Sequence, residues 1–242
     1  MISVNFWKQV VAGATALVSA VGFANCTQTN GRATELSNQL AKVSSMTTIN
    51  ESTMTPPTAA TGLQKATFGT GCFWCTEAMY ESLDGVVSAI SGYEGGEGAN
   101  PTYKAVCTGT TGHAECVEVT YDPAKITYSE LLEAFFRSHD PTTLNRQGAD
   151  VGTQYRSVVF YHSDEQRQFA ERAKTELNNV KAYDKPIITE ISAASTFYEA
   201  EAYHQNYFAQ NPEQGYCAFV IAPKLDKFKK VFKERLKPEM AH

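Results

Sequence analysis

The sequence lacks the features of a nucleic-acid-binding protein and of a protein embedded in a membrane. Its 242 residues carry a net charge of −5, so nothing in the charge argues for a nucleic-acid partner. The apolar run at residues 10–24 is too short for a comfortable transmembrane helix. The chain also has no internal repeat. A hydrophobic content of 43% is enough for a core, and the length suggests one main domain or at most two.

The apolar run near the N-terminus has the shape of a secretory signal. Lys8 precedes it, and Gly22 and Ala24 give the small residues that a signal peptidase accepts. Cys26 offers an alternative, cleavage just before a cysteine that then receives lipid, although the three residues before it depart from the usual lipobox. The remaining alternative is an uncleaved membrane anchor, which would place the domain on the same side of the membrane. We therefore expect residues 1–26 to direct export to a periplasm, where the protein is either free or anchored by a lipid at Cys26.

Residues 27–62 contain no aromatic residue and many threonines and serines. This composition is typical of a flexible linker. It leaves residues 63–242 as the catalytic domain, which we expect to be monomeric.

Short apolar runs and turn residues divide that domain into intermingled strands and helices. Strands are predicted over residues 64–68, 86–93, 103–109, 114–122, 156–162 and 187–192, and helices over residues 75–83, 128–139, 164–182, 198–211 and 223–236. Thr127 is a predicted helix cap, and Ser163 with Gln166 a predicted capping box. The strands 103–109 and 114–122 are expected to form a central hairpin. Without a run of βα repeats, the pattern indicates an α+β two-layer sandwich with a mixed or antiparallel sheet and a ferredoxin-like core.

The chain has six cysteines but only one CxxC pair, Cys72 and Cys75. A structural zinc site usually needs two such pairs. Cys107 and Cys116 stand too far apart within the predicted hairpin to replace the second pair. The sequence therefore argues against a metal site.

Cys72 stands where a predicted strand ends and a helix begins. The free N–H groups and positive dipole end of a helix stabilise a thiolate, so we expect a lowered pKa and a nucleophile. The alternative is an inert buried thiol, but Gly71 leaves the sulfur approachable. Phe73 and Trp74 would then line an apolar recess beside that sulfur.

Glu115 lies on a strand whose alternation places it on the same face as Val117, Val119 and Tyr121. A carboxyl group in apolar surroundings has a raised pKa, which suits a general acid. The alternative is a buried glutamate paired with a basic side chain. Two glycine-rich loops offer further candidate site residues, Asp150 and Tyr155 in one loop and Tyr103 at the end of the other. Taken singly, each of these residues is weak evidence for a functional site.

Together these residues resemble one family, methionine sulfoxide reductase A, the peptide-methionine (S)-S-oxide reductases. The resemblance covers about residues 63–222. It rests on the motifs GCFWC at 71–75, SGYEGG at 91–96, NPTYKAVCTGTTGHAE at 100–115, VTYDP at 119–123, HDPTTLNRQGADVGTQYRS at 139–157, and HQNYFAQNP with GYC at 204–217.

The resemblance implies that the Cys72 thiolate attacks the sulfoxide sulfur while Glu115 protonates the sulfoxide oxygen. It implies that the oxygen is held by Tyr103, Tyr155 and Asp150, and the methyl group by Phe73 and Trp74. Methionine leaves, and Cys72 remains as a sulfenic acid. The substrate is free methionine sulfoxide or an oxidised protein, and the preference for the S epimer rests on the resemblance alone.

The resemblance also implies how Cys72 is recycled. A second thiol condenses with the sulfenic acid, and a thioredoxin-like dithiol reduces the disulfide, with no other cofactor. Cys217 matches the family's usual resolving position, and we favour it as the first resolver. Cys75 is close enough in sequence to resolve Cys72 directly or to relay a disulfide, whereas Cys107 and Cys116 are expected to be bystanders.

Two other functions fit part of the sequence. A thiol–disulfide oxidoreductase would use Cys72 and Cys75, but it leaves Glu115 and Asp150 without a task. A non-catalytic, surface-anchored binding module would use its cysteines as buried disulfides. The binding module does not account for an accessible cysteine at a helix start.

Overall fold

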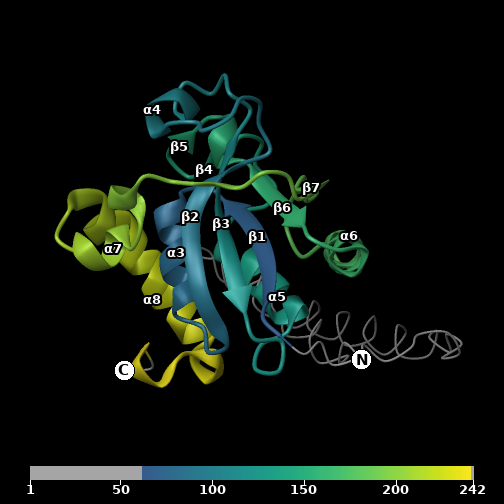
Figure 1. The fold of residues 1–242 in the computed structure, drawn as a ribbon. Helices are drawn as coiled ribbons and strands as arrows, with labels where there is room; N and C mark the ends of the chain where they lie inside the picture. The colour runs from purple at the N-terminus through teal and green to yellow at the C-terminus, as the bar shows by residue number, and fades with distance from the viewer. Residues whose placement is uncertain (1–61, 241–242) are drawn as a thin grey trace, which may run out of the picture.

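A six-stranded mixed sheet forms the centre of the fold (Figure 1). The computed structural model describes residues 62–240, so the predicted signal peptide and almost all of the predicted linker lie outside the described residues. The strands run in the order β7-β6-β1-β3-β2-β8, and only β6 and β7 are parallel. Their bounds are Gln64–Thr70 (β1), Val86–Glu94 (β2), Ala114–Tyr121 (β3), Ser157–Tyr161 (β6), Glu190–Ala193 (β7) and Tyr198–Glu199 (β8). The predicted α+β class is confirmed.

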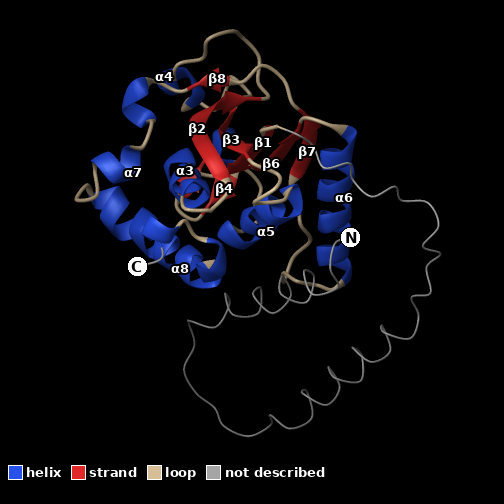
Figure 2. Cartoon of the chain, turned by 60° about the horizontal axis from the view of Figure 1, so that its bottom comes forward, coloured by secondary structure: helices blue, strands red, loops and turns tan. Residues whose placement is uncertain are grey.

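Helices cover one face of this sheet (Figure 2). The longer ones are α3 (Phe73–Glu81), α5 (Tyr128–Ser138), α6 (Asp164–Asn179) and α8 (Ala222–Val231), and the shorter ones are α4 (Tyr103–Val106) and α7 (Tyr207–Gln210). Helices α3, α5 and α6 contact strands directly, and α8 packs on α3 and α5. The main apolar core lies between these helices and the sheet. Val117, Val119 and Tyr121 point into it, as the alternation of β3 predicts.

The other face of the sheet carries a smaller apolar cluster of Ala114, Cys116, Val158 and Phe160. The chain between β7 and β8 crosses this face (Figure 1), and Ala194 and Phe197 pack on the cluster. This segment takes the chain from β7 at one edge of the sheet to the other edge, where β8 pairs with β2. On its way it covers the cluster.

The predicted helix caps are present, with one difference. The Thr127 side chain accepts from the Glu130 N–H and the Glu130 carboxylate accepts from the Thr127 N–H, which completes a capping box. Ser163 caps α6 by accepting from the Gln166 N–H. The Gln166 side chain does not return to Ser163, because its oxygen accepts from the His162 N–H.

The predicted hairpin of residues 103–109 and 114–122 is wrong. The Thr102 hydroxyl accepts from the Ala105 N–H and so starts the short helix α4 where a strand was predicted. Strand β3 pairs instead with β1 and β2, its antiparallel neighbours in the sheet. Residues 103–113 are therefore a connection beside the sheet and contribute no strand.

The predicted helix over residues 198–211 is also wrong. Tyr198 and Glu199 pair with β2, and Asn206 has a left-handed φ of 53° that interrupts helical geometry. The segment becomes β8, a 3-10 turn at Ala202–His204 and the single turn of α7. In the last helix the predicted apolar stripe is buried except for Val231, which is exposed.

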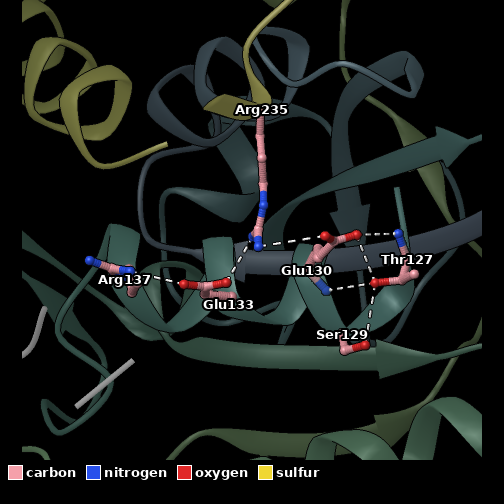
Figure 3. Close-up of polar contacts among 6 residues, drawn as sticks. All are labelled: Thr127, Ser129, Glu130, Glu133, Arg137 and Arg235. Atoms are coloured by element: carbon pink, nitrogen blue, oxygen red, sulfur yellow. Dashed lines mark hydrogen bonds and ion pairs between the residues drawn. The ribbon is translucent and has the colours of Figure 1, made fainter. Parts of the chain in front are cut away.

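A polar network fastens the C-terminal end of the chain to α5 (Figure 3). The buried carboxylate of Glu133 accepts from Arg137 Nη1 at 2.9 Å and from Arg235 Nη1 at 2.8 Å. Arg235 also lies 3.5 Å from Glu130, and its carbonyl accepts from the Asp84 N–H. The chain after α8 is thus held by charge-assisted contacts.

Candidate active site

A cavity of about 240 Å³ opens at the N-terminal end of α3. The seven residues predicted to be catalytic or substrate-binding all line it, and one further tyrosine joins them. The lining residues are Cys72, Phe73, Trp74, Tyr103, Glu115, Asp150, Tyr155 and Tyr216. They come from sequence positions more than 140 residues apart, so the fold brings them together.

Cys72 is the N-cap residue of α3 and directly follows Gly71. Gly71 has a φ of +98°, and an added Cβ would lie 2.7 Å from the Gln147 side chain. Both facts require glycine at this position. Gln147 lies on the small strand β4 (Arg146–Gln147), which pairs with β5 (Asp150–Val151). Its close approach to Gly71 places this hairpin against the start of α3.

The predicted lowering of the Cys72 pKa is wrong. Its side chain is only 7% exposed, and burial raises the pKa of the Cys72 thiol, with a further rise from the neighbouring Cys75 thiol. The nearby Tyr216 hydroxyl acts in the opposite direction. The desolvation of a buried sulfur outweighs the helix terminus, which sequence position alone does not reveal.

Cys75 lies one helical turn after Cys72. The neighbouring Cys72 thiol lowers the Cys75 pKa although burial opposes the shift. Cys217 is fully buried at the start of a π-helical turn, Cys217–Ile221, and burial raises its pKa. Cys217 contributes to the Cys75 pKa, and Cys72 contributes to the Cys217 pKa. The three thiols thus lie near one another, and of these three only Cys72 lines the cavity.

Glu115 projects from β3 into the same cavity and is 2% exposed. Its Oε2 accepts a hydrogen bond of 3.2 Å from the Phe73 N–H, the first amide of α3. Burial raises the Glu115 pKa well above its ordinary value, and the charge of Cys72 raises it further. Burial thus favours the protonated form of Glu115, and its hydrogen bond to the Phe73 N–H links it to the helix that begins at Cys72.

Two tyrosine hydroxyls face the same space. Burial raises the pKa of Tyr103 and of Tyr155, and the charge of Glu115 contributes to both shifts. Both side chains remain protonated hydrogen-bond donors across the physiological range. They suit an oxygen that gains negative charge.

Asp150, on the small strand β5 (Asp150–Val151), accepts a hydrogen bond of 2.6 Å from the Tyr216 hydroxyl. Tyr216 was missed by sequence reasoning, which assigned a role only to the cysteine that follows it. The signal was present, since the tyrosine belongs to the same GYC motif. It fixes Asp150 from the C-terminal side of the cavity and brings its hydroxyl to Cys72.

Phe73 and Trp74 form the apolar wall of the cavity. Phe73 is buried against the rings of Tyr93 and Tyr103, with centroids 5.8 and 6.4 Å away. The Trp74 indole stacks on Tyr207 with centroids 3.8 Å apart. The wall is rigid because each ring is packed on its outer side.

Among residues 62–240, the two remaining cysteines, Cys107 and Cys116, lie off the cavity lining. Cys107 is exposed at the end of α4, Cys116 is buried on the opposite face of the sheet, and both are free thiols. Within residues 62–240, no three His, Cys, Asp or Glu side chains are grouped so as to hold a metal ion. None of the helices in that range is long and apolar enough to cross a membrane.

Comparison with known families decides the relationship of the chain. A family model described as peptide methionine sulfoxide reductase matches residues 64–236. The chain belongs to the peptide methionine sulfoxide reductase family. The family match spans every residue that lines the cavity.

Known members are similar over most of their length. Peptide methionine sulfoxide reductase MsrA of Polynucleobacter asymbioticus is 55% identical over 179 residues, which are 74% of this chain and 94% of that protein. The protein of the same name from Thermus thermophilus is 54% identical, covering 72% of this chain and 97% of its own. The reductase domain is thus shared almost completely.

Solved structures of the family have the same fold. Mxr1 from Saccharomyces cerevisiae in reduced form has 40% identity and a TM-score of 0.59, covering 70% of this chain and 95% of that chain. Methionine sulfoxide reductase A of Corynebacterium diphtheriae has 38% identity and a TM-score of 0.57, covering 66% and 80%.

Proposed function

We propose that this chain reduces methionine S-sulfoxide, free or within proteins, to methionine. The observation that carries the proposal is the shared cavity, in which Cys72 and Glu115, whose pKa burial raises, face one space beside an apolar wall. A thiol–disulfide exchanger has no need of a neutral carboxylic acid there. A binding module has no need of a free thiol.

The reaction starts with a sulfoxide whose methyl group lies against Phe73 and Trp74. The Cys72 sulfur attacks the sulfoxide sulfur, and Glu115 protonates the oxygen as the S–O bond weakens. The hydroxyl group passes to Cys72 as methionine leaves, which oxidises Cys72 to a sulfenic acid. The thiol proton returns to Glu115, so atoms and charge balance over the step.

The oxygen is held by the hydroxyls of Tyr103 and Tyr155 during this step. Both are protonated donors, and donors placed where charge develops stabilise a transition state more than a ground state. Asp150 keeps its place through Tyr216. The Asp150 carboxylate accepts hydrogen bonds and donates none, so it acts by orienting hydroxyl groups around the sulfoxide oxygen.

Recycling requires a second thiol to condense with the sulfenic acid, releasing water and forming a disulfide. Cys75 stands one helical turn after Cys72 on the same helix start, and this proximity supports Cys75 as the first resolver. Cys217, which the resemblance favours, then takes over the disulfide by exchange, and an external thioredoxin-like dithiol reduces it. This cycle uses no other cofactor.

Assays with purified protein separate the alternatives. Reduction of a methyl sulfoxide with dithiothreitol is expected for the reductase, and NADPH-coupled thioredoxin should support continuous turnover. A disulfide exchanger would reduce insulin and leave the sulfoxide unchanged. No activity in either assay would leave only a binding function.

For the N-terminal region, we propose export by a signal within residues 1–26 and a tether over residues 27–62. The apolar run and the small residues before Cys26 support this. The intact mass of the mature protein tests it, because cleavage and lipid attachment at Cys26 each give a distinct mass. Light scattering of the same sample tests the proposed monomer.

A further inference from the structure

The segment that follows β8 supports the apolar wall of the cavity from behind. We propose that His204 is a positioning residue that holds the Trp74 indole in place, and that Glu201 fixes the imidazole tautomer this requires. Neither side chain lines the cavity. The inference rests on the proposed sulfoxide reduction and concerns how the same site selects its substrate.

The contact with Trp74 defines the state of the imidazole. Trp74 Nε1 donates a hydrogen bond of 3.1 Å to His204 Nδ1. An indole N–H can only donate, so Nδ1 is the unprotonated nitrogen and the neutral ring carries its hydrogen on Nε2. Burial lowers the His204 pKa, which keeps the ring neutral near pH 7 although Glu201 opposes the shift.

Glu201 faces the other nitrogen. His204 Nε2 is buried, lies 3.8 Å from Glu201 Oε2 and has no hydrogen-bond partner among residues 62–240. A carboxylate at this distance still favours the tautomer with hydrogen on Nε2, because that N–H points its positive end toward the charge. The tautomer that accepts from Trp74 is the one that Glu201 stabilises.

Glu201 is itself fixed to the site. Its Oε1 accepts from the Tyr103 N–H and its Oε2 from the Tyr93 hydroxyl, both at 2.9 Å. Although burial acts to raise it, these hydrogen bonds hold the Glu201 pKa below its ordinary value. One carboxylate therefore connects β2, the start of α4 and His204.

The imidazole also fills the space behind the wall. Its centroid lies 5.0 Å from the ring of Phe73 and 4.5 Å from that of Tyr103. His204 thus contacts both aromatic residues of the predicted methyl pocket and one of the oxygen-binding tyrosines. Loss of the Nδ1 acceptor would leave the indole N–H unpaired and release the ring that sets the width of the pocket.

Replacing His204 with phenylalanine removes the acceptor and keeps a ring. We expect kcat/KM for a methyl sulfoxide to fall roughly tenfold, the upper range for one lost buried hydrogen bond. We expect a smaller fall for the corresponding ethyl sulfoxide, because a loosened pocket discriminates less against one methylene. The preference for methyl over ethyl should fall at least about threefold, which is part of the roughly 10- to 200-fold discrimination that one methylene gives in an apolar pocket.

This ratio is independent of the fraction of folded protein, since both substrates are assayed on one preparation. Tyr203→Phe is the matched control, because Tyr203 is the exposed neighbour of His204 and keeps its ring. It should leave the ratio unchanged. A wild-type ratio in His204→Phe overturns the role of His204, whereas a wild-type chain that reduces neither sulfoxide overturns the proposed function as well.

A double-mutant cycle tests whether the effect passes through Trp74. In a Trp74→Phe background no indole N–H exists, so His204→Phe should change the methyl-to-ethyl ratio less than about twofold, the range expected when no hydrogen bond is lost. A full, additive effect in that background would contradict the positioning role.

Discussion

The two sides of the cavity are built in different ways. On one side, Cys72, Phe73 and Glu115 stand on α3 and β3, where backbone hydrogen bonds and the main core fix them. On the other side, Tyr216 and Cys217 belong to a segment of short turns between β8 and α8. The groups proposed to carry out the chemistry lie on the regular side. The irregular side supplies groups proposed to position them or to exchange disulfides.

The difference has a physical basis. Attack and proton transfer need fixed geometry, which packed strands and helices provide. Disulfide exchange needs a thiol to move toward another, which a segment without long helices allows at lower cost. The irregular segment is nonetheless anchored at both ends, by β8 on the sheet and by Arg235 on α5.

The largest effect is expected on the regular side, at Cys72. Cys72→Ser should lower sulfoxide reduction with dithiothreitol to the rate of the reaction without enzyme, because no other thiol of residues 62–240 lines the cavity. Cys116→Ala, on the opposite face of the sheet, is the control and should keep the wild-type rate. Residual turnover in Cys72→Ser would move the nucleophile to another cysteine.

Glu115→Gln should slow the chemical step by about 100-fold or more, the range of a lost general acid. The acid acts only when protonated, and burial raises its pKa. The wild-type rate should therefore be constant at lower pH and fall as pH rises through the Glu115 pKa. In the variant this falling limb should disappear from single-turnover rates, and a retained limb would show that the proton comes from elsewhere.

At the two cysteines proposed to exchange disulfides, Cys75 on α3 and Cys217 on the irregular side, we expect effects on recycling without effects on the first turnover. Cys75→Ser and Cys217→Ser should each release one methionine per chain and lose thioredoxin-driven turnover at least about tenfold, the effect of a missing exchange partner. In Cys217→Ser, the mass after one turnover should show a Cys72–Cys75 disulfide. Full thioredoxin-dependent turnover in Cys75→Ser would make Cys217 the direct resolver.

The smallest effect is expected at the C-terminal anchor. Arg235→Met removes a charge-assisted hydrogen bond to the buried Glu133, which keeps its partner Arg137. The free energy of unfolding should fall by about 1.5 kcal/mol, the lower range for a hydrogen bond to a charged group. Urea denaturation measures this. The rate of sulfoxide reduction should stay unchanged, and a loss of activity would mean that the anchor also positions the site.

Sequence reasoning was more accurate for the regular side than for the irregular one. The period-two pattern of β3 placed Glu115 on the core face, and the residues 72–75 were correctly assigned to a strand–helix junction. The pattern of residues 198–211 suggested a helix because it contains alanine, glutamate and glutamine. Pairing with β2 and the left-handed Asn206 prevented it, and neither is visible in local propensity.

Some site properties depend on burial, which one sequence does not give. The raised Cys72 pKa follows from desolvation, which the helix-terminus argument left out. Tyr216, Glu201 and His204 act through long-range contacts with Asp150, Tyr103 and Trp74. These hydrogen bonds join residues about 65 to 130 positions apart, so a local sequence pattern does not reveal them.

The most direct measurement follows the oxygen acceptor in a single turnover. A Cys75→Ser/Cys217→Ser double variant is treated with one equivalent of methionine sulfoxide in the presence of dimedone, and the adduct is located by peptide mass. We predict one methionine released per chain and one adduct, at Cys72. Methionine release with Cys72 unmodified, or an adduct at Cys107 or Cys116 alone, would contradict the account.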